Sequence, residues 1–180
     1  IVIGMDYFEP YSYQASDGEY KGIDVELAKE AFRRLGYRPK FENIVWEDKD
    51  ELLADGTIDC LWSSYSMNGR EDKYQWAGPY LYSRQMVVVK NESEIQTLSD
   101  LKGKRIAVQA TTKAEDLFLH NIKSDLPQMQ QVNCFSTTNE IYAALRKSYV
   151  DAIAGHEAML GSLVKEGKDA YRMLDESIYK

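Results

Sequence analysis

The sequence contains few of the residues that build disulfide frameworks, linkers and membrane spans. Its 180 residues include two cysteines, eleven glycines and four prolines. Two cysteines do not make a disulfide framework, and so little glycine and proline excludes a linker or a low-complexity protein. No apolar run approaches the roughly 18 residues that a membrane-spanning helix requires. These absences leave an ordinary globular protein of one large domain or two small ones.

Basic charge is also scarce. Lys and Arg number 22 against 29 Asp and Glu, which gives a net charge of −7. An acidic excess without a basic stripe argues against nucleic acid and anionic lipid as partners. Tyrosine is abundant, with 13 copies against five Phe and three Trp. Its apolar ring and polar tip suit a wet ligand cleft, and they suit half-buried strands as well.

Each cysteine lies in an apolar stretch, Cys60 within 58–62 and Cys134 within 132–135. An unpaired cysteine is usually a small buried hydrophobe. We therefore expect two buried thiols rather than a bridge between these positions.

The first half of the chain alternates between strand and helix patterns. The pattern predicts strands at 1–5, 40–45 and 58–64 and helices at 24–35 and 48–55. Asp24 is the predicted N-cap of the first helix, and Gly36 ends it. The predicted apolar face of this helix consists of Leu27, Ala28, Ala31, Phe32 and Leu35. The order β-α-β-α-β is typical of parallel βαβ units.

A second alternation follows the predicted strand at 85–90 and the polar segment 91–100. It predicts strands at 104–109, 131–135, 151–154 and 171–174 and helices at 112–122, 138–147 and 156–166. The sequence thus predicts two α/β lobes, residues 1–89 and 90–180, with a second hinge near the C-terminal end. In open α/β sheets a ligand lies beyond the carboxyl ends of the strands, against helix N-termini.

Motifs for catalysis and metal binding are missing. The sequence has no Gly-x-Gly-x-x-Gly, no P-loop and no Gly-x-Ser-x-Gly. His156-Glu157 begins like a zinc-protease motif, but Leu160 occupies the position of its second histidine. His120, the other histidine, is a strand and a helix away. We expect no metal, no cofactor and no catalytic residue.

Residues 58–82 are dense in groups that bind ligands. A predicted strand leads into Ser63, Ser64 and Ser66, and Arg70 follows a turn. A guanidinium beside hydroxyls and backbone amides is what a carboxylate ligand requires, because arginine binds it through two charge-assisted hydrogen bonds. The alternative is a surface arginine paired with an acidic residue at 71 or 72.

The chain resembles the bacterial extracellular solute-binding proteins of family 3, the polar amino-acid type of the type II periplasmic-binding fold. The similar segments are 9–13, 17–28, 53–59, 70–80, 98–109, 144–145 and 150–152. Each segment alone is weakly specific, and their order and spacing together are strongly so. The resemblance implies two Rossmann-like lobes around a ligand cleft. It also implies that the chain stops before the C-terminal segment that completes the first lobe.

The resemblance also implies roles for residues of the first lobe. Arg70 would bind the carboxylate of the ligand. Ser64 and Ser66 would present backbone and hydroxyl groups to it. Aromatic walls would come from Phe8 or Tyr11 and from Trp46, and ordinary core packing is the alternative for these three rings.

In the second lobe, the resemblance assigns Thr111 and Thr112 to the ligand carboxylate, at a helix N-terminus that favours an anion. The amino-acid binders of the family place an aspartate beyond the strand at 151–154 to hold the ligand's ammonium. Here His156 occupies that position, and Glu157 follows it. Either Glu157 replaces the aspartate or no anion faces the ammonium, and solvent exposure of His156 is the alternative.

The expected function is extracytoplasmic binding of a small carboxylate-bearing solute, an amino acid above all, by hinge closure. The protein would work without catalysis and serve ABC-type uptake with a membrane permease. One alternative is the ligand-sensing domain of a membrane receptor, a histidine kinase or diguanylate cyclase, with a fused signalling module. Another is an enzyme similar to cyclohexadienyl dehydratases, with Glu157 or His156 as the acid. The expected location is the periplasm or the cell surface, with or without a membrane anchor.

Overall fold

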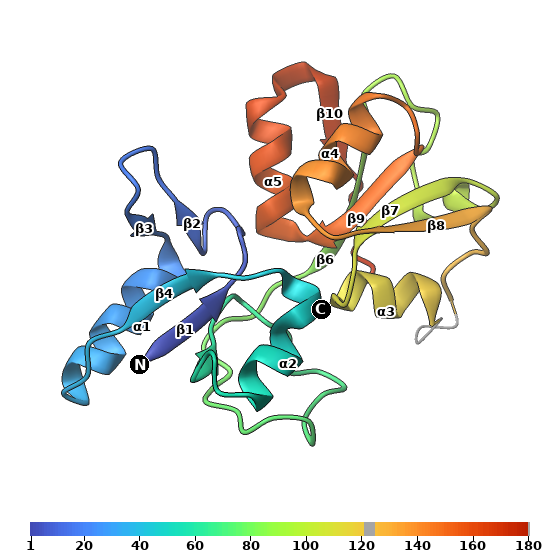
Figure 1. The fold of residues 1–180 in the computed structure, drawn as a ribbon. Coiled ribbons are helices and arrows are strands. Elements are labelled where there is room, and N and C mark those ends of the chain that lie inside the picture. Colours follow the sequence, from blue (N-terminus) through green and yellow to red (C-terminus); the bar gives the residue numbers. More distant parts are fainter. Residues whose placement is uncertain (121–124, 180) are drawn as a thin grey trace. The chain divides into compact units, whose positions relative to one another are not determined.

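A computed structural model describes residues 1–120 and 125–179. The chain forms two compact α/β units, Ile1–Leu81 and Tyr82–Lys180, which Figure 1 shows in blue to green and in green to red. The sequence predicted a boundary after residue 89, whereas the contacts place it after Leu81. The difference arises because the strand at 85–90 pairs only with strands of the second unit.

Unit 1, residues 1–81, is built on a small parallel sheet with the strand order β4-β1-β5. The strands are β1 (Val2–Met5), β4 (Lys40–Asn43) and β5 (Cys60–Leu61), and a separate hairpin pairs β2 (Tyr13–Gln14) with β3 (Tyr20–Lys21). The helices are α1 (Ile23–Arg34) and α2 (Lys49–Ala54), the latter preceded by a 3-10 turn at Trp46–Asp48. The parallel order confirms the predicted βαβ arrangement.

The start of α1 differs from the prediction. Gly22, not Asp24, is the N-cap residue, and it has a φ of 121°. A Cβ at this position would lie 2.2 Å from the carbonyl oxygen of Tyr11. Only glycine fits this close approach, since the φ is also one that other residues rarely adopt. Asp24 therefore lies inside the first turn of α1, where its side chain is buried.

The buried face of α1 also differs from the predicted apolar face. Its buried residues are Asp24, Val25 and Ala28, whereas Leu27 is 42% and Leu35 68% exposed. The hydrophobic spacing thus predicted the helix correctly, but it predicted only in part which face of the helix is buried.

The predicted strand at 58–64 is reduced to Cys60–Leu61. Ser64 has a φ of 49°, in the left-handed region, which ends the extended conformation. Residues 62–64 of the predicted strand belong to the loop that follows β5, and residues 58–59 precede β5.

Unit 2, residues 82–180, contains a five-stranded sheet with the order β10-β6-β9-β7-β8. Its strands are β6 (Gln85–Lys90), β7 (Arg105–Gln109), β8 (Gln131–Phe135), β9 (Ala152–His156) and β10 (Tyr171–Met173). The pairs β7-β8 and β7-β9 are parallel, and β6 is antiparallel to both of its neighbours. All five strands were predicted within two residues at each end, because buried strands read as short apolar runs.

The described residues of this unit also form α3 (Lys113–Leu119), α4 (Thr138–Arg146) and α5 (Glu157–Glu166). A capping box between Thr137 and Glu140 fixes the start of α4. The helix predicted at 112–122 ends at Leu119, and residues 121 and 122 lie outside the described residues. The core of the unit consists mainly of Val87, Val89, Leu101, Ile106, Val108, Leu117, Ala152 and Leu174.

Cys60 and Cys134, both described, are not joined by a disulfide. Cys60 is half-buried, but Cys134 is exposed, so the expectation of a buried thiol is wrong for Cys134. This thiol lies on β8, the strand at one edge of the sheet. Among the described residues, no helix is long and apolar enough to cross a bilayer. The same residues contain no group of three side chains suited to hold a metal ion.

Candidate functional site

The loop after β5 places the Arg70 guanidinium against an aromatic ring. The Cζ atom of Arg70 lies 4.9 Å from the centroid of the Tyr65 ring. One guanidinium nitrogen donates to the carbonyl oxygen of Ser66 at 3.3 Å. The indole N–H of Trp76 donates to the carbonyl oxygen of Arg70 at 3.0 Å. Backbone and side chain of Arg70 are thus both held in place, and the structure brings Arg70 and Ser66 together.

Tyr65 is the centre of an aromatic cluster in unit 1. Its ring centroid lies 5.1 Å from that of Trp46, 5.6 Å from that of Tyr74 and 5.8 Å from that of Trp76. Tyr74 and Trp76 also pack edge to face at 5.3 Å. Burial, with a hydrogen bond to Asp50, raises the pKa of Tyr74 to about 12. The cluster supports the Tyr65 ring, over which the guanidinium of Arg70 lies.

Trp46 connects this cluster to α2. The Trp46 side chain is buried, and the ammonium of Lys49 lies 5.3 Å from its ring centroid and 5.7 Å from that of Tyr65. The Lys49 ammonium also donates to the carbonyl oxygen of Trp46 at 3.2 Å. Lys49 is only 2% exposed, so two cations, Lys49 and Arg70, share one tyrosine ring. No local sequence pattern indicated that Tyr65, Tyr74 and Lys49 belong to this cluster.

Phe8 and Tyr11 form a second aromatic pair. Their rings stack with centroids 5.5 Å apart and an interplanar angle of 21°. Tyr11 is 7% exposed, and its carbonyl oxygen accepts the amide of Asp24 at 2.9 Å. Tyr11 therefore belongs to the core of unit 1, whereas Phe8 is half-buried.

Ser64 is attached to a buried carboxylate. Its hydroxyl donates to one Asp24 carboxylate oxygen at 2.8 Å, and the Tyr80 hydroxyl donates to the other at 2.8 Å. Asp24 is 1% exposed. Burial raises the pKa of this carboxyl group, and the two hydroxyl donors oppose that effect. No sequence pattern indicated this cluster, whose members are 40 and 56 residues from Asp24.

In unit 2, the predicted carboxylate-binding threonines make contacts within their own chain segment. The Thr111 amide donates to the Glu115 carboxylate at 2.7 Å, and Thr111 has a φ of 57°. The Thr112 hydroxyl donates to the carbonyl oxygen of Gln109 at 2.7 Å. The Glu115 carboxylate thus binds the Thr111 amide at the start of α3, where the ligand carboxylate was expected.

His156 and Glu157 lie at the junction of β9 and α5. The Nδ1 atom of His156 lies 3.2 Å from the hydroxyl of Ser83. Burial lowers the pKa of His156 to about 4, so the imidazole is neutral at pH 7. The alternative of a solvent-exposed His156 is wrong, because the ring is mostly buried.

Glu157 forms a bidentate ion pair with Arg84, with one of its two hydrogen bonds measuring 3.0 Å. The same guanidinium lowers the pKa of the Glu157 carboxyl. The amide of Glu157 also donates to the carbonyl oxygen of Arg84 at 2.9 Å. This acidic side chain is therefore already partly neutralised by its neighbour.

Comparison with protein families now identifies the chain. A family model for bacterial extracellular solute-binding proteins, family 3, matches residues 1–176. The chain belongs to this family. The resemblance seen in the sequence is therefore confirmed over nearly the whole of the 180 residues.

Curated relatives in the family are named for the amino acids that they bind. The chain is 28% identical to the L-cystine-binding protein TcyJ of Escherichia coli over 98% of its own length and 66% of that protein's. It is 25% identical to the glutamate-binding protein GluB of Corynebacterium efficiens over 97% of its length and 62% of that protein's. The chain thus spans less than two thirds of the length of these two relatives.

Solved structures agree with the fold of the family. A substrate-binding protein of an ABC uptake transporter from Streptococcus pneumoniae with bound histidine is 28% identical, with a TM-score of 0.87. The match covers 97% of this chain and 73% of that one. The substrate-binding protein of an amino acid ABC transporter gives 26% identity and a TM-score of 0.86, over 97% of this chain and 77% of that one. The predicted type II periplasmic-binding fold is thereby confirmed.

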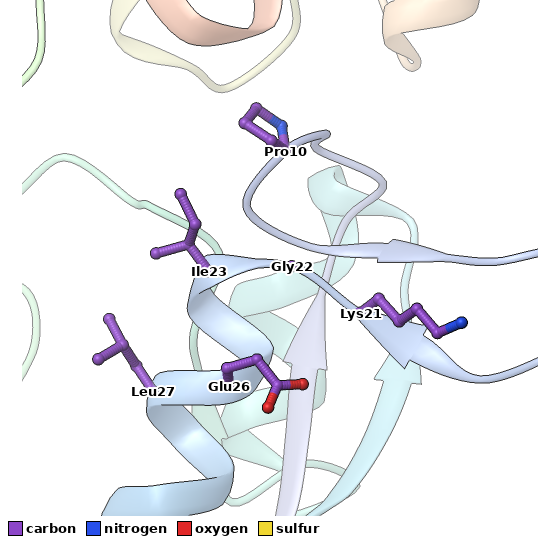
Figure 2. A pocket seen from close by; sticks show the side chains of 6 residues that line it. All are labelled: Pro10, Lys21, Gly22, Ile23, Glu26 and Leu27. Atoms are coloured by element: carbon purple, nitrogen blue, oxygen red, sulfur yellow. The ribbon is translucent and has the colours of Figure 1, made fainter.

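Besides the Arg70 region, unit 1 has an open hollow of about 640 Å³. Figure 2 shows its lining, which consists of Pro10, Lys21, Gly22, Ile23, Glu26 and Leu27. The predicted ligand-binding residues are not among them. The hollow has no convergent set of polar groups that would orient a small ligand, so we base the candidate site on Arg70.

Proposed function

We propose that this chain binds a small solute that carries a carboxylate, an amino acid or a close relative, outside the cytoplasm. The observation that carries the proposal is the position of Arg70, whose guanidinium is held over Tyr65 and beside the Ser66 carbonyl. The names of the relatives, which bind cystine and glutamate, support an amino acid. Membership of an extracellular solute-binding family supports the location.

Arg70 would bind the solute carboxylate in unit 1. A planar guanidinium matches the two oxygens of a carboxylate, and such charge-assisted pairs are about twice as strong as neutral hydrogen bonds. Stacking on Tyr65 fixes the plane of the guanidinium before the ligand arrives, so less side-chain freedom is lost on binding. Ser64 and Ser66 would contribute further polar groups, and Trp46 with Phe8 or Tyr11 would supply apolar walls.

Unit 2 would then close on the bound solute by hinge motion. In this proposal Thr111 and Thr112 contribute to carboxylate binding, and His156 and Glu157 contact the amino end. The ligand would supply the free energy that favours the closed state over the open one. Delivery to a membrane permease for ABC-type uptake follows from the same proposal.

The chemistry of the His156–Glu157 corner does not favour the enzyme alternative. A general acid at neutral pH needs a carboxyl group whose pKa is raised or a histidine that titrates near 7. Here Arg84 lowers the pKa of Glu157, and burial lowers that of His156 to about 4. Binding without turnover is therefore the function that this geometry supports best.

Isothermal titration of the folded chain with the twenty amino acids and with small carboxylic acids tests the proposal. We expect heat with at least one of them and at least about 30-fold weaker binding in Arg70→Ala, because truncating one partner of a charge pair costs about 2 kcal/mol or more. Arg70→Lys keeps the charge without the planar fork and should bind with intermediate affinity. Arg33→Ala, on the exposed face of α1, is the matched control. Absence of heat with every compound, or near wild-type affinity in Arg70→Ala, would refute it.

A further inference from the structure

Asp24 is unusual because it is a fully buried acidic side chain with no cation beside it in the described part of the chain. Among the residues that the structure describes, it is the only Asp or Glu that is fully buried. Its two oxygens accept hydrogen bonds from Ser64 and Tyr80, both at 2.8 Å. No Lys, Arg or His of the described chain lies within ion-pair distance of it, and the groups that face it are these two hydroxyls and the backbone amide of Ser64. Burying a carboxylate in this way costs free energy of folding. A residue that lowers stability in this way is a candidate for a functional role.

The Asp24 carboxylate joins three segments of unit 1. Asp24 lies in the first turn of α1, Ser64 lies in the loop after β5, and Tyr80 lies near the end of the unit. Ser64 is held in the left-handed region, with a φ of 49°. The next residue is Tyr65, whose ring carries the guanidinium of Arg70 at 4.9 Å. A single peptide bond therefore separates the residue fixed by Asp24 from the ring that supports Arg70.

We propose that Asp24 is a positioning residue for solute binding, because it fixes the strained backbone at Ser64 and thereby the Tyr65 ring that orients Arg70. The link to the solute rests on the function proposed above. The link from Asp24 to Arg70 rests on the geometry of unit 1 alone, and it can be measured without any ligand.

The effect of the buried charge on the stability of the fold distinguishes a positioning role of Asp24 from a merely structural one. Burial raises the pKa of Asp24 above that of an unfolded chain. The folded state then binds more protons than the unfolded state between the two pKa values, so stability falls as pH rises through that window. Wherever Asp24 is ionised in the folded chain, its charge therefore opposes folding. Asp24→Asn keeps the size of the side chain, removes the charge and replaces one acceptor oxygen by an N–H2 group. Because a hydroxyl can rotate to accept from that N–H2 group, the variant should be at least as stable as the wild type.

The test compares wild type, Asp24→Asn and Asp17→Asn by NMR at pH 7 without ligand. The probe is the Nε–Hε resonance of Arg70, which the Tyr65 ring current displaces. We expect Asp24→Asn to move this resonance toward the position of a solvent-exposed arginine without lowering the melting temperature. Asp17→Asn, an exposed aspartate in the same unit, should leave it unchanged. For whichever solute binds the wild type, Asp24→Asn should bind about ten- to a hundredfold more weakly, as when a hydrogen bond to a charged group is lost.

An unchanged Arg70 resonance in folded Asp24→Asn overturns the proposal. So does a shift that is accompanied by a fall in melting temperature, because that result indicates a structural role. Ser64→Ala removes one of the two donors and leaves the carboxylate intact, and it decides the matter if Asp24→Asn does not fold. We expect Ser64→Ala to displace the resonance in the same direction, and no displacement also overturns the proposal. If no amino acid binds the wild type, the proposed function fails while the resonance still reports on Asp24.

Discussion

Replacing Tyr65 by leucine tests whether one ring organises the candidate site. Tyr65 packs against Trp46, Tyr74 and Trp76 with centroid distances of 5.1 to 5.8 Å, and two cations lie over it. Leucine keeps much of the apolar area and loses every interaction that depends on the aromatic ring. Tyr65→Phe keeps the ring and removes only the hydroxyl, so it is the matched control.

The size of the effect follows from these contacts. Each aromatic pair contributes about 0.5–1.5 kcal/mol beyond its buried area, and the cation–π contacts contribute about 0.5–1 kcal/mol each at partly exposed sites. Because Tyr65 is half-buried, we take the lower ends of these ranges. The expected loss for Tyr65→Leu is about 2 kcal/mol, whereas Tyr65→Phe should cost no more than about 1 kcal/mol, the value of one hydrogen bond.

Urea unfolding followed by tryptophan fluorescence is suited to this measurement. The three tryptophans of the sequence, Trp46, Trp62 and Trp76, all lie in unit 1, so their emission reports on that unit. With a slope of about 1–2 kcal/mol per molar urea, the midpoint of Tyr65→Leu should fall by about 1–2 M. Tyr82→Leu, at a position that is 87% exposed, should change it little. Equal midpoints for Tyr65→Leu and Tyr65→Phe would show that the ring does not hold the cluster together.

Two further predictions concern His156 and Gly22. His156 in the folded chain should titrate near pH 4 by NMR. In the unfolded chain the same histidine takes up its proton near pH 6.5. The free energy of unfolding should therefore decrease as the pH is lowered from about 6.5 to 4, by at most about 3 kcal/mol. His156→Gln should flatten this part of the stability profile, and an ordinary histidine pKa would contradict the burial argument. Gly22→Ala should destabilise unit 1 by about 2 kcal/mol or more, because its Cβ would meet the Tyr11 carbonyl at 2.2 Å. Gly18→Ala, which also has a positive φ but meets no neighbour, should cost about 1 kcal/mol; equal losses in the two variants would exclude the clash.

Elements whose formation depends on nearby residues were predictable. The strand at 85–90 agrees with β6 at both ends, and the helix predicted at 138–147 agrees with α4 within one residue. For β6 the apolar run itself carries the signal, and for α4 the apolar spacing and the adjacent capping residue Thr137 do. The buried face of α1 was less predictable, because Leu27 and Leu35 have the right spacing but nothing in unit 1 covers them fully.

Within the candidate site, the sequence points to Arg70, Ser66 and Trp46 and to none of the contacts of Tyr65, Tyr74 and Lys49. Arg70 stands out in the sequence because a carboxylate ligand needs a guanidinium beside small polar residues. The function of its neighbours depends on contacts that the local sequence does not contain. Glu115 reaches back to the Thr111 amide, and Arg84 pairs with Glu157 from 73 residues away. Both contacts occupy groups that the sequence assigned to a ligand.

The sequence by itself determined the family, the alternation of strands and helices, and the arginine that would bind a carboxylate, because these depend on local pattern and on the order of short motifs. The tertiary structure decided how Arg70 is held and what Asp24 does. Asp24 has the sequence context of a helix cap, yet its partners Ser64 and Tyr80 come from distant segments. Only the folded chain brings two hydroxyls to a carboxylate that water does not reach, and that burial turns an ordinary aspartate into the link between α1 and the support of Arg70.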